Sequence, residues 1–366
     1  MKIAHIFTTK GYLIAESYIR FVRESFHNDE HEFIVVGTDF DESKNSFPIN
    51  QTGIIYLSDY ERDYNKLIRL LNSYDKIIYH ALSIPTKTQI KFLTNKNVMN
   101  KIFWVSWGYD LYQWKQTADT IKKAVANVIH YIFRKRIRNF VGIFPPDIEF
   151  FKNEFMTNAK TYFAPYVSLL YSDLYKREVN LQQLKYKVND GEQINIQIGH
   201  SSSKILNHLD VLEKLSNFKN ENIRIYLPLS YGDKEYGNMV EKNAKIIFGE
   251  KVICLGEIIE KEKYHDLLSV IDIAIFNTSR QIGLGNIIPL LYMGKKIYLP
   301  KNSVMYDYYN KLGINICNYS DIQNYDFKKF IEPIDGKMAN EYVKKNIQNK
   351  DLMIEVWKKV FEAPLK

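Results

Sequence analysis

The stretch that decides the fold class is Ile194-Asn195-Ile196-Gln197-Ile198-Gly199-His200-Ser201-Ser202-Ser203. Its alternating isoleucines predict a buried strand over residues 194–198, and Gly199 permits a tight turn directly after it. The serines can then cap a following helix, which gives the strand, turn and helix order of a parallel α/β domain. Exposed backbone N–H groups at such a helix start bind anions, so a nucleotide diphosphate would fit here. An ordinary serine-rich helix cap is the competing interpretation.

The same alternation of apolar runs and helix-period segments extends along most of the chain and predicts two successive α/β domains with parallel sheets. The predicted strands of the first half are 2–7, 33–37, 77–81, 102–106, 141–144 and 161–163, and those of the second half are 194–198, 223–227, 252–255, 273–276 and 296–299. The alternation stops between Pro165 and Gly191, which indicates a linker. We expect domains over 1–178 and 193–337, a linker over 179–192, and a helical segment over 338–366 that packs back on one or both domains.

Composition indicates a folded, soluble-class protein. The 366 residues suit two domains at roughly 150 residues each, and 46% hydrophobic with 25% charged residues are ordinary values. The two cysteines, Cys254 and Cys317, exclude a four-cysteine zinc site and suit a reducing compartment. Fifty basic against 42 acidic residues give a net charge of +8, which favours phosphate-bearing or anionic partners. We expect a cytosolic location, because the N-terminus enters a predicted strand directly and no apolar stretch could span a bilayer.

Polar, glycine-containing loops follow two further strands of the second half. Residues 277–286, Asn-Thr-Ser-Arg-Gln-Ile-Gly-Leu-Gly-Asn, concentrate amide, hydroxyl and guanidinium donors beside two glycines, as binding of sugar hydroxyls and phosphates requires. Residues 228–232 set polar side chains between a proline and a glycine, and Tyr231 could stack on a base; normal turn chemistry is the alternative here. Neither loop matches a Walker or a full dinucleotide-binding glycine pattern. In parallel sheets, ligands bind beyond the carboxyl ends of strands, where these loops lie.

Two aspartates of the first half are candidate catalytic groups. Asp110 follows the predicted strand 102–106 and could act as a general base or orient a sugar hydroxyl, or simply cap the next turn. Asp39 follows the strand 33–37 and is the secondary candidate; Asp39-Phe40-Asp41 has the form of a metal-binding Asp-x-Asp, but its polar surroundings favour a solvated turn. His200 and His208 have no Glu or Cys at metal spacing, so we expect no metal site.

Residues 115–138 form a basic region whose only acid is Asp119. Apolar residues interleave with the cations, so a helix here would combine an apolar stripe with a basic end, as interfacial helices do. Anionic lipid is one partner that this pattern fits, and a core-packed helix with a solvated basic end is the other interpretation. No nucleic-acid-binding signature accompanies the region. The candidate membrane or acceptor contacts are Lys122, Lys123, Arg134, Lys135, Arg136 and Arg138.

Several of these segments together resemble a known family. They are 197–201 with the Asn207-His208 pair, 227–231, the run 276–285 that contains Arg-Gln-Ile-Gly-Leu-Gly, and, in the first half, 107–112. The resemblance is to the bacterial TDP-N-acetylfucosamine:lipid II N-acetylfucosaminyltransferases, glycosyltransferase family 56. It is strongest between residues 194 and 299.

This resemblance implies a GT-B fold, with two Rossmann-like parallel-sheet domains that face each other across a cleft. It implies transfer of a deoxyamino sugar (4-acetamido-4,6-dideoxygalactose, Fuc4NAc) from a dTDP-sugar to an undecaprenyl-diphosphate-linked saccharide at the inner face of the bacterial inner membrane, in enterobacterial common antigen synthesis. The first domain with its basic helix would receive the acceptor. By analogy no cofactor or metal is needed, since Arg280 and backbone N–H groups can neutralise the leaving diphosphate. The implied donor site comprises Gly199, His200, Ser201, Ser202, His208, Pro228, Ser230, Tyr231, Asn277, Arg280, Gln281, Gly283, Gly285 and Asn286.

Three alternatives stay open from the sequence. A GT-B transferase could use another nucleotide-sugar. A sugar-nucleotide epimerase of the same fold would need catalytic carboxylates and no lipid acceptor. A non-catalytic sugar-nucleotide or membrane-binding module would bind its ligand without turnover.

Overall fold

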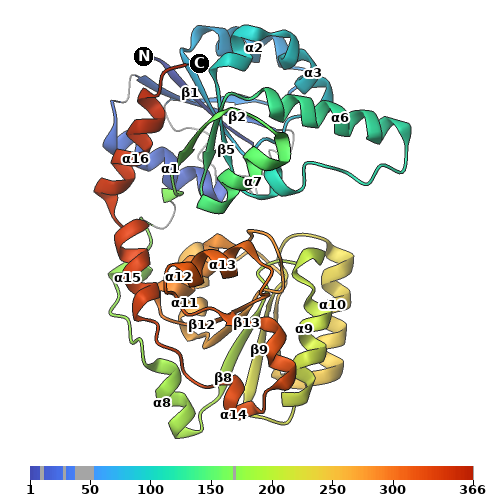
Figure 1. Cartoon of the computed structure of the whole chain (residues 1–366), viewed down its shortest axis with the longest axis vertical. Coiled ribbons are helices and arrows are strands. Elements are labelled where there is room, and N and C mark those ends of the chain that lie inside the picture. Colours follow the sequence, from blue (N-terminus) through green and yellow to red (C-terminus); the bar gives the residue numbers. More distant parts are fainter. Residues whose placement is uncertain (9–11, 28–29, 38–52, 168–169, 366) are drawn as a thin grey trace. The chain divides into compact units, whose positions relative to one another are not determined.

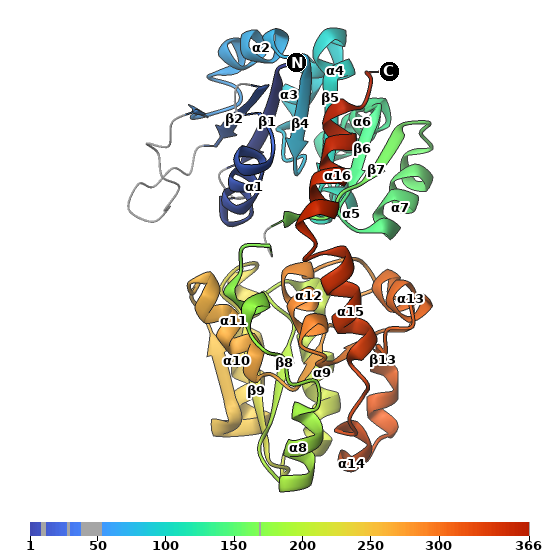
Figure 2. The ribbon, with the colours of Figure 1, turned by 90° about the vertical axis from the view of Figure 1, so that its left-hand side faces the viewer.

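The computed structural model describes residues 1–8, 12–27, 30–37, 53–167 and 170–365. The chain divides into two compact units, which we call unit 1 (residues 1–171 and 349–366) and unit 2 (residues 172–348). Figures 1 and 2 show the elements of each unit from two directions. The candidate Asp39 lies outside the described residues.

Unit 1 is built on a sheet of seven parallel strands. They are β1 (Ile3–Thr8), β2 (His31–Val36), β3 (Ile54–Leu57), β4 (Lys76–His80), β5 (Ile102–Ser106), β6 (Asn139–Gly142) and β7 (Lys160–Phe163). They lie in the order β3-β2-β1-β4-β5-β6-β7, so the direction of winding reverses between β1 and β4. This confirms the predicted parallel sheet and adds β3.

Helices cover both faces of this sheet because its strands are apolar on both sides. Successive residues alternate between two cores: Tyr79 and Trp104 face the first, whereas Ile78 and Phe103 face the second. The first core is covered by α2 (Tyr64–Ser73), α3 (Thr86–Thr94), α4 (Lys96–Lys101), α6 (Ile121–Arg136) and α7 (Pro145–Phe155), and the second by α1 (Tyr12–Ser25) and α16 (Lys350–Glu362). The short helix α5 (Tyr109–Tyr112) follows β5.

The last helix, α16, is part of unit 1 although it follows unit 2 in the chain. Its Trp357 is fully buried and donates a hydrogen bond to the Pro165 carbonyl at 3.1 Å. The buried Lys76 ammonium donates to three carbonyls at the end of the helix, those of Val360, Phe361 and Ala363. The preceding helix, α15 (Lys337–Asn346), packs on α12 (Leu284–Tyr292) of unit 2. The segment 338–366 is therefore shared between the units.

Unit 2 contains six parallel strands in the order β10-β9-β8-β11-β12-β13. They are β8 (Ile194–Ile198), β9 (Ile223–Pro228), β10 (Val252–Leu255), β11 (Ile273–Ile275), β12 (Lys296–Leu299) and β13 (Cys317–Asn318). The helices of this unit are α8 (Gln183–Asp190), α9 (His208–Leu215), α10 (Lys234–Phe248), α11 (Lys261–Val270), α12 (Leu284–Tyr292), α13 (Val304–Lys311), α14 (Phe327–Phe330) and α15. Winding reverses between β8 and β11, which is the position where open α/β sheets bind ligands.

Helix α8 lies within the stretch predicted as a linker. None of its residues is fully buried, but Leu184 and Val188, four residues apart, pack partly buried against the unit 2 core. The Lys187 ammonium, 2.9 Å from the buried Asp272 carboxylate, holds the helix against the start of β11. The ion pair and the apolar contacts together attach α8 to unit 2.

Candidate functional site

The three loops singled out in the sequence meet at the carboxyl ends of the unit 2 strands, and we call this end of the sheet the unit 2 edge. They follow β8, β9 and β11, which are adjacent and parallel. Hydrogen bonds join the loops: Gly199 N donates to Ile275 O at 2.9 Å and Ser202 N donates to Tyr231 O at 2.8 Å. The Asn207 amide donates to Asn277 O at 3.0 Å. The structure therefore brings the predicted residues of unit 2 to a single edge.

Two glycines let buried imidazole rings pack against the backbone at this edge. Gly199 has a φ of +63° and Gly283 a φ of +70°, a region that side chains rarely adopt. A Cβ added at Gly199 would lie 2.5 Å from His208 Nε2, and one at Gly283 would lie 2.8 Å from His200 Nδ1. Only glycine fits at either position without displacing a ring.

Buried polar atoms without partners accumulate along the same edge. Leaving such an atom unpaired costs about 1–3 kcal/mol, so we expect bound water or a polar ligand to complete the hydrogen bonding. Within the described ranges, the side-chain atoms of this kind at the edge are Gln197 Oε1, His200 Nδ1, His208 Nδ1, His208 Nε2, Thr278 Oγ1 and Gln281 Oε1. They come from β8, the start of α9 and the loop after β11.

Both histidines of the edge are neutral at neutral pH. Burial, and then the neighbouring His208 and Arg280, lower the pKa of His200 to about 3, and burial lowers the pKa of His208 to about 4. A neutral imidazole offers one N–H donor and one acceptor, which suits sugar hydroxyls. The buried Arg280, which is 8% exposed, adds a permanent positive charge that suits a diphosphate.

Several predicted residues hold the loops in place. Ser202 is buried, and its hydroxyl donates to Tyr231 O at 2.8 Å. Asn277 donates from its amide to the Asp210 carboxylate at 2.8 Å. Pro228 is buried as the last residue of β9. These contacts are with other groups of the protein, so these side chains stabilise the conformations of the loops.

Other predicted residues lie where a ligand could reach them. Tyr231 is 52% exposed, and its hydroxyl is hydrogen-bonded to the buried Ser201. Ser230, beside it, is half-buried. Gly285 is exposed in the first turn of α12, and a Cβ added there would meet no atom within 4 Å. A ligand could therefore approach the backbone at Gly285 closely.

Sequence reasoning did not propose Gln197 and Tyr264 as site residues, although both belong to this edge. The Gln197 amide donates to Gly199 O at 2.8 Å and to Asn286 Oδ1 at 3.0 Å, and the Tyr264 hydroxyl donates to the same Asn286 oxygen at 2.5 Å. Asn286 is thus oriented by two donors. An amide at an inward position of an isoleucine strand is the sequence signal that points to Gln197.

Unit 1 has a cavity of about 470 Å³, lined by residues that follow β1, β2 and β4 and by α5 and α6. Asp110 lines it and is itself buried within α5. Its carboxylate accepts hydrogen bonds from Leu82 N at 2.8 Å, Trp104 Nε1 at 2.5 Å and Trp107 N at 2.9 Å. Burial raises the pKa of Asp110 while these donors oppose that shift. Gly108, not Asp110, occupies the N-cap of α5.

Comparison with known proteins identifies the family. A family model described as 4-alpha-L-fucosyltransferase, glycosyl transferase group 56, matches residues 2–325. The chain belongs to glycosyl transferase group 56. This confirms the resemblance found in the sequence, and it makes the protein a hexosyltransferase.

Solved structures similar to this group 56 glycosyltransferase share its fold. Sucrose-phosphate synthase from Thermosynechococcus elongatus is 13% identical with a TM-score of 0.68, and all of both chains is covered. Anabaena Alr3699/HepE, solved in complex with UDP-glucose, is 10% identical with a TM-score of 0.68, and 99% of each chain is covered. WaaG, a glycosyltransferase involved in lipopolysaccharide biosynthesis, is 10% identical with a TM-score of 0.61, covering 99% of this chain and 100% of its own. Together with the two parallel sheets, these similarities confirm the predicted GT-B class.

Arg134 of this group 56 enzyme does not lie on the surface as the basic-region prediction assumed. It is 4% exposed, because it falls on the inward face of α6, and it lines the unit 1 cavity. Its guanidinium donates to Asp110 O at 3.2 Å and His130 O at 3.3 Å. Lys123 is half-buried and pairs with Asp119 at 2.8 Å. The exposed members of the predicted basic set are Lys122, Lys135, Arg136 and Arg138.

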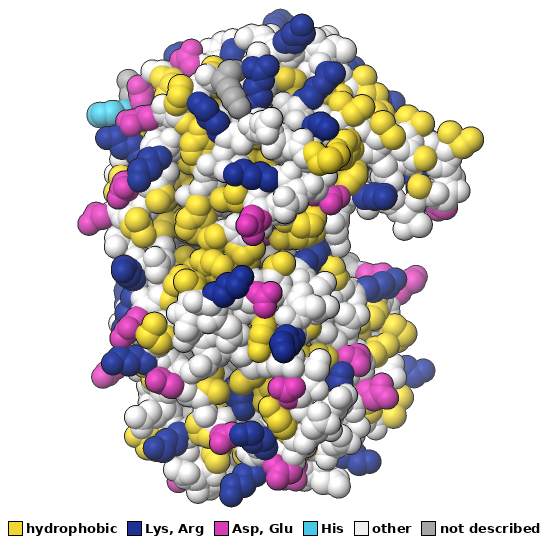
Figure 3. Space-filling view, viewed as in Figure 1, with side chains coloured by type: hydrophobic (Ala, Val, Ile, Leu, Met, Phe, Trp, Pro, Cys, Tyr) yellow, Lys and Arg dark blue, Asp and Glu magenta, His cyan; other side chains and the backbone are white. Residues whose placement is uncertain are grey.

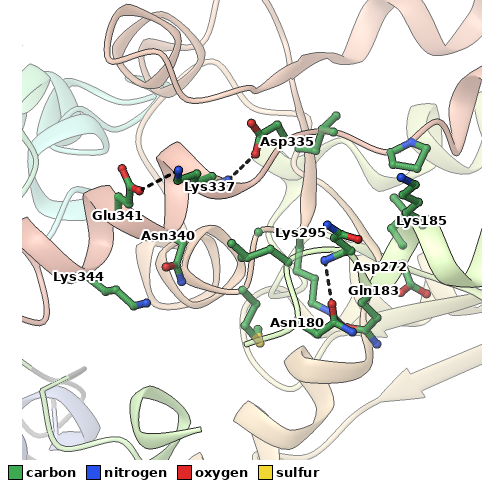
Figure 4. Close-up of a pocket in the computed structure, with 17 residues that line it drawn as sticks. Asn180, Gln183, Lys185, Asp272, Lys295, Asp335, Lys337, Asn340, Glu341 and Lys344 are labelled. Carbon is green, nitrogen blue, oxygen red and sulfur yellow. Dashed lines mark hydrogen bonds and ion pairs between the residues drawn. The ribbon is translucent and has the colours of Figure 1, made fainter. Parts of the chain in front are cut away.

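A second cavity, of about 680 Å³, lies at the opposite edge of the unit 2 sheet and contains no predicted site residue. Figure 4 shows its charged lining, which includes Asp272 before β11 and Lys295 before β12. Lys295 donates to the Gln183 side chain and to Ser269 O at 2.7 Å. These contacts tie α8 and α11 to the start of β12, so Lys295 stabilises the packing of unit 2.

Proposed function

We propose that this enzyme transfers Fuc4NAc from a dTDP-sugar to an undecaprenyl-diphosphate-linked saccharide in bacterial surface polysaccharide synthesis, as in enterobacterial common antigen. The observation that carries the proposal is the unit 2 edge, where a buried arginine and two neutral histidines meet unpaired polar atoms. Group 56 membership supplies the reaction class. The edge supplies what a nucleotide-sugar needs, namely a positive charge for the diphosphate and neutral donors and acceptors for the sugar.

In this proposal the donor lies over the loops after β8, β9 and β11. Arg280 and the backbone N–H groups at the start of α12 stabilise the diphosphate as it leaves, since charge develops there in the transition state. His200, which is 5% exposed, hydrogen-bonds to the sugar or the phosphates as a neutral group, and the fully buried His208 packs against Gly199. Tyr231, half-exposed in the loop after β9, stacks on the base.

The acceptor would bind in the unit 1 cavity. Its lining combines the amides of Gln113 and Gln116 with Trp114 and Arg134, the residue types that bind sugars and diphosphates. Asp110 would orient an acceptor hydroxyl or accept its proton. Among the described helices, none has the length and apolar character of a membrane span. A lipid-linked acceptor therefore leads us to propose peripheral binding at the cytoplasmic side of the inner membrane.

A transfer assay tests the proposal. The purified enzyme is incubated with dTDP-Fuc4NAc and a lipid-linked acceptor, and the glycosylated lipid is quantified. Arg280→Ala should weaken donor binding by about 1.5–3 kcal/mol, the value of a hydrogen bond to a charged group. Lys245→Ala is the matched control, because Lys245 is an exposed cation in the last turn of α10. Epimerised nucleotide-sugar formed without acceptor, or unchanged donor affinity in Arg280→Ala, would contradict the proposal.

A further inference from the structure

Helix α6 presents an apolar stripe to solvent. Ile121 is 85% exposed, Val125 52%, Val128 57% and Ile132 37%. Their spacing of four, three and four residues keeps them within about 60° of arc on a helix that turns 100° per residue. Figure 3 shows hydrophobic side chains gathered over this helix.

The inward face of the same helix is mostly polar, because of the four buried residues of α6 only Phe133 is apolar. Asn127, His130 and Arg134 are 8%, 9% and 4% exposed and lie opposite the stripe. Asn127 exchanges two hydrogen bonds with the Gln116 backbone, at 2.9 and 2.8 Å. His130 contacts Trp114 O at 3.2 Å. A surface helix of a soluble protein normally shows the reverse pattern, with its apolar face inside.

Cations flank the stripe. Lys135 and Arg136 are exposed at its end, on either side of Ile132 around the helix, and Lys122 is exposed beside Ile121. The helix itself contains no Asp or Glu; Asp119, just before it, is paired with Lys123. An apolar stripe bordered by unopposed cations matches an anionic lipid surface in both polarity and charge.

We propose that α6 lies in the surface of an anionic lipid bilayer, with Ile121, Val125, Val128 and Ile132 among the acyl chains. Lys122, Lys135 and Arg136 then contact headgroup phosphates. The opposite face of the helix contributes His130 and Arg134 to the unit 1 cavity. One helix thereby connects the membrane surface to the cavity. The assignment of a lipid-linked acceptor to that cavity rests on the proposed function.

Vesicle flotation tests this surface without any donor or acceptor. The full chain is floated with phosphatidylglycerol–phosphatidylethanolamine vesicles and with phosphatidylcholine vesicles. The double variant Val125→Gln/Val128→Gln should lower the partition coefficient about tenfold or more, because two apolar side chains no longer leave water. Lys135→Gln/Arg136→Gln should remove the preference for anionic vesicles. Ile246→Gln, a substitution of an apolar residue 72% exposed on α10, is the control and should bind as the unaltered chain does.

Three results would overturn the inference. The first is that the unaltered chain fails to float with anionic vesicles, and the second is that the valine double variant floats equally well. The third is that sedimentation without lipid reveals a dimer that the valine variant dissociates, which would show that a second copy covers the stripe. The variants concern exposed side chains, so unchanged thermal melting verifies folding. If flotation follows the prediction but no sugar is transferred, the membrane surface stands and the proposed function fails.

Discussion

The substitution Gly283→Ala tests the geometry of the candidate donor site. Gly283 has a φ of +70°, and a methyl group there would lie 2.8 Å from His200 Nδ1. The left-handed backbone costs an alanine about 1–2 kcal/mol. Displacing a ring that is 5% exposed adds about 1–3 kcal/mol of overpacking. We expect a loss of about 2–5 kcal/mol in the stability of unit 2, together with weaker binding of nucleoside diphosphates.

Two glycines of the same unit provide matched controls. Gly191 has a φ of +67° but open space around its added Cβ, so Gly191→Ala should show the backbone cost alone and leave nucleotide binding unchanged. Gly285 has open space and no positive φ, so Gly285→Ala should cost no stability. In a double-mutant cycle, His200→Ala should recover the part of the Gly283→Ala loss that arises from the ring.

Denaturant unfolding followed by circular dichroism measures these losses. All four tryptophans, Trp104, Trp107, Trp114 and Trp357, belong to unit 1, so their fluorescence reports that unit separately and should not shift. If Gly283→Ala were no more destabilising than Gly191→Ala, or if His200→Ala recovered nothing, the packing of His200 against Gly283 would be refuted.

Three further predictions concern unit 1. Lys76→Met should destabilise it by about 2 kcal/mol or more, measured by tryptophan fluorescence, because a charged donor to three buried carbonyls is lost. Burial lowers the pKa of His5 and His80, so below pH 6.5 the unfolded chain binds more protons than the folded chain. The free energy of unfolding should therefore fall on acidification, by about 1.4 kcal/mol per pH unit for each of the two histidines. The variant His80→Phe should show a smaller slope. Asp110→Asn should lower the stability of unit 1 by about 1–3 kcal/mol, because an NH₂ group replaces one acceptor of buried donors. If the thermal melt of this variant between pH 6 and 8 equalled that of the unaltered chain, the assigned contacts would be contradicted.

The sheets could be predicted from sequence because buried parallel strands are short, continuous apolar runs. The run at 102–106 coincides with β5, and the run at 194–198 coincides with β8. The two strands that were not predicted, β3 and β13, are mostly half-buried: only Leu57 of β3 and no residue of β13 is fully buried. Both are edge strands that are defined by the neighbour with which they pair.

The location of the candidate site was predictable, but its internal contacts were not. Parallel pairing brings the ends of β8, β9 and β11 together, so residues such as Arg280 could be assigned to one edge. The packing of His200 against Gly283 and the bond from Tyr264 to Asn286 depend on tertiary contacts that leave no periodic signal. Arg134 shows the same limit, because the basic run hides that it points inward.

The most direct test of the account is a thermal-shift titration of the purified chain with thymidine, uridine, guanosine and adenosine diphosphates. A ligand that binds only the folded state stabilises it by about 2.7 kcal/mol at one hundred times its Kd. We expect the largest concentration-dependent stabilisation with thymidine diphosphate, and its loss in Arg280→Ala. The absence of stabilisation by any nucleoside diphosphate would contradict a nucleotide-sugar site at the unit 2 edge, and a larger effect of uridine diphosphate would contradict the thymidine donor.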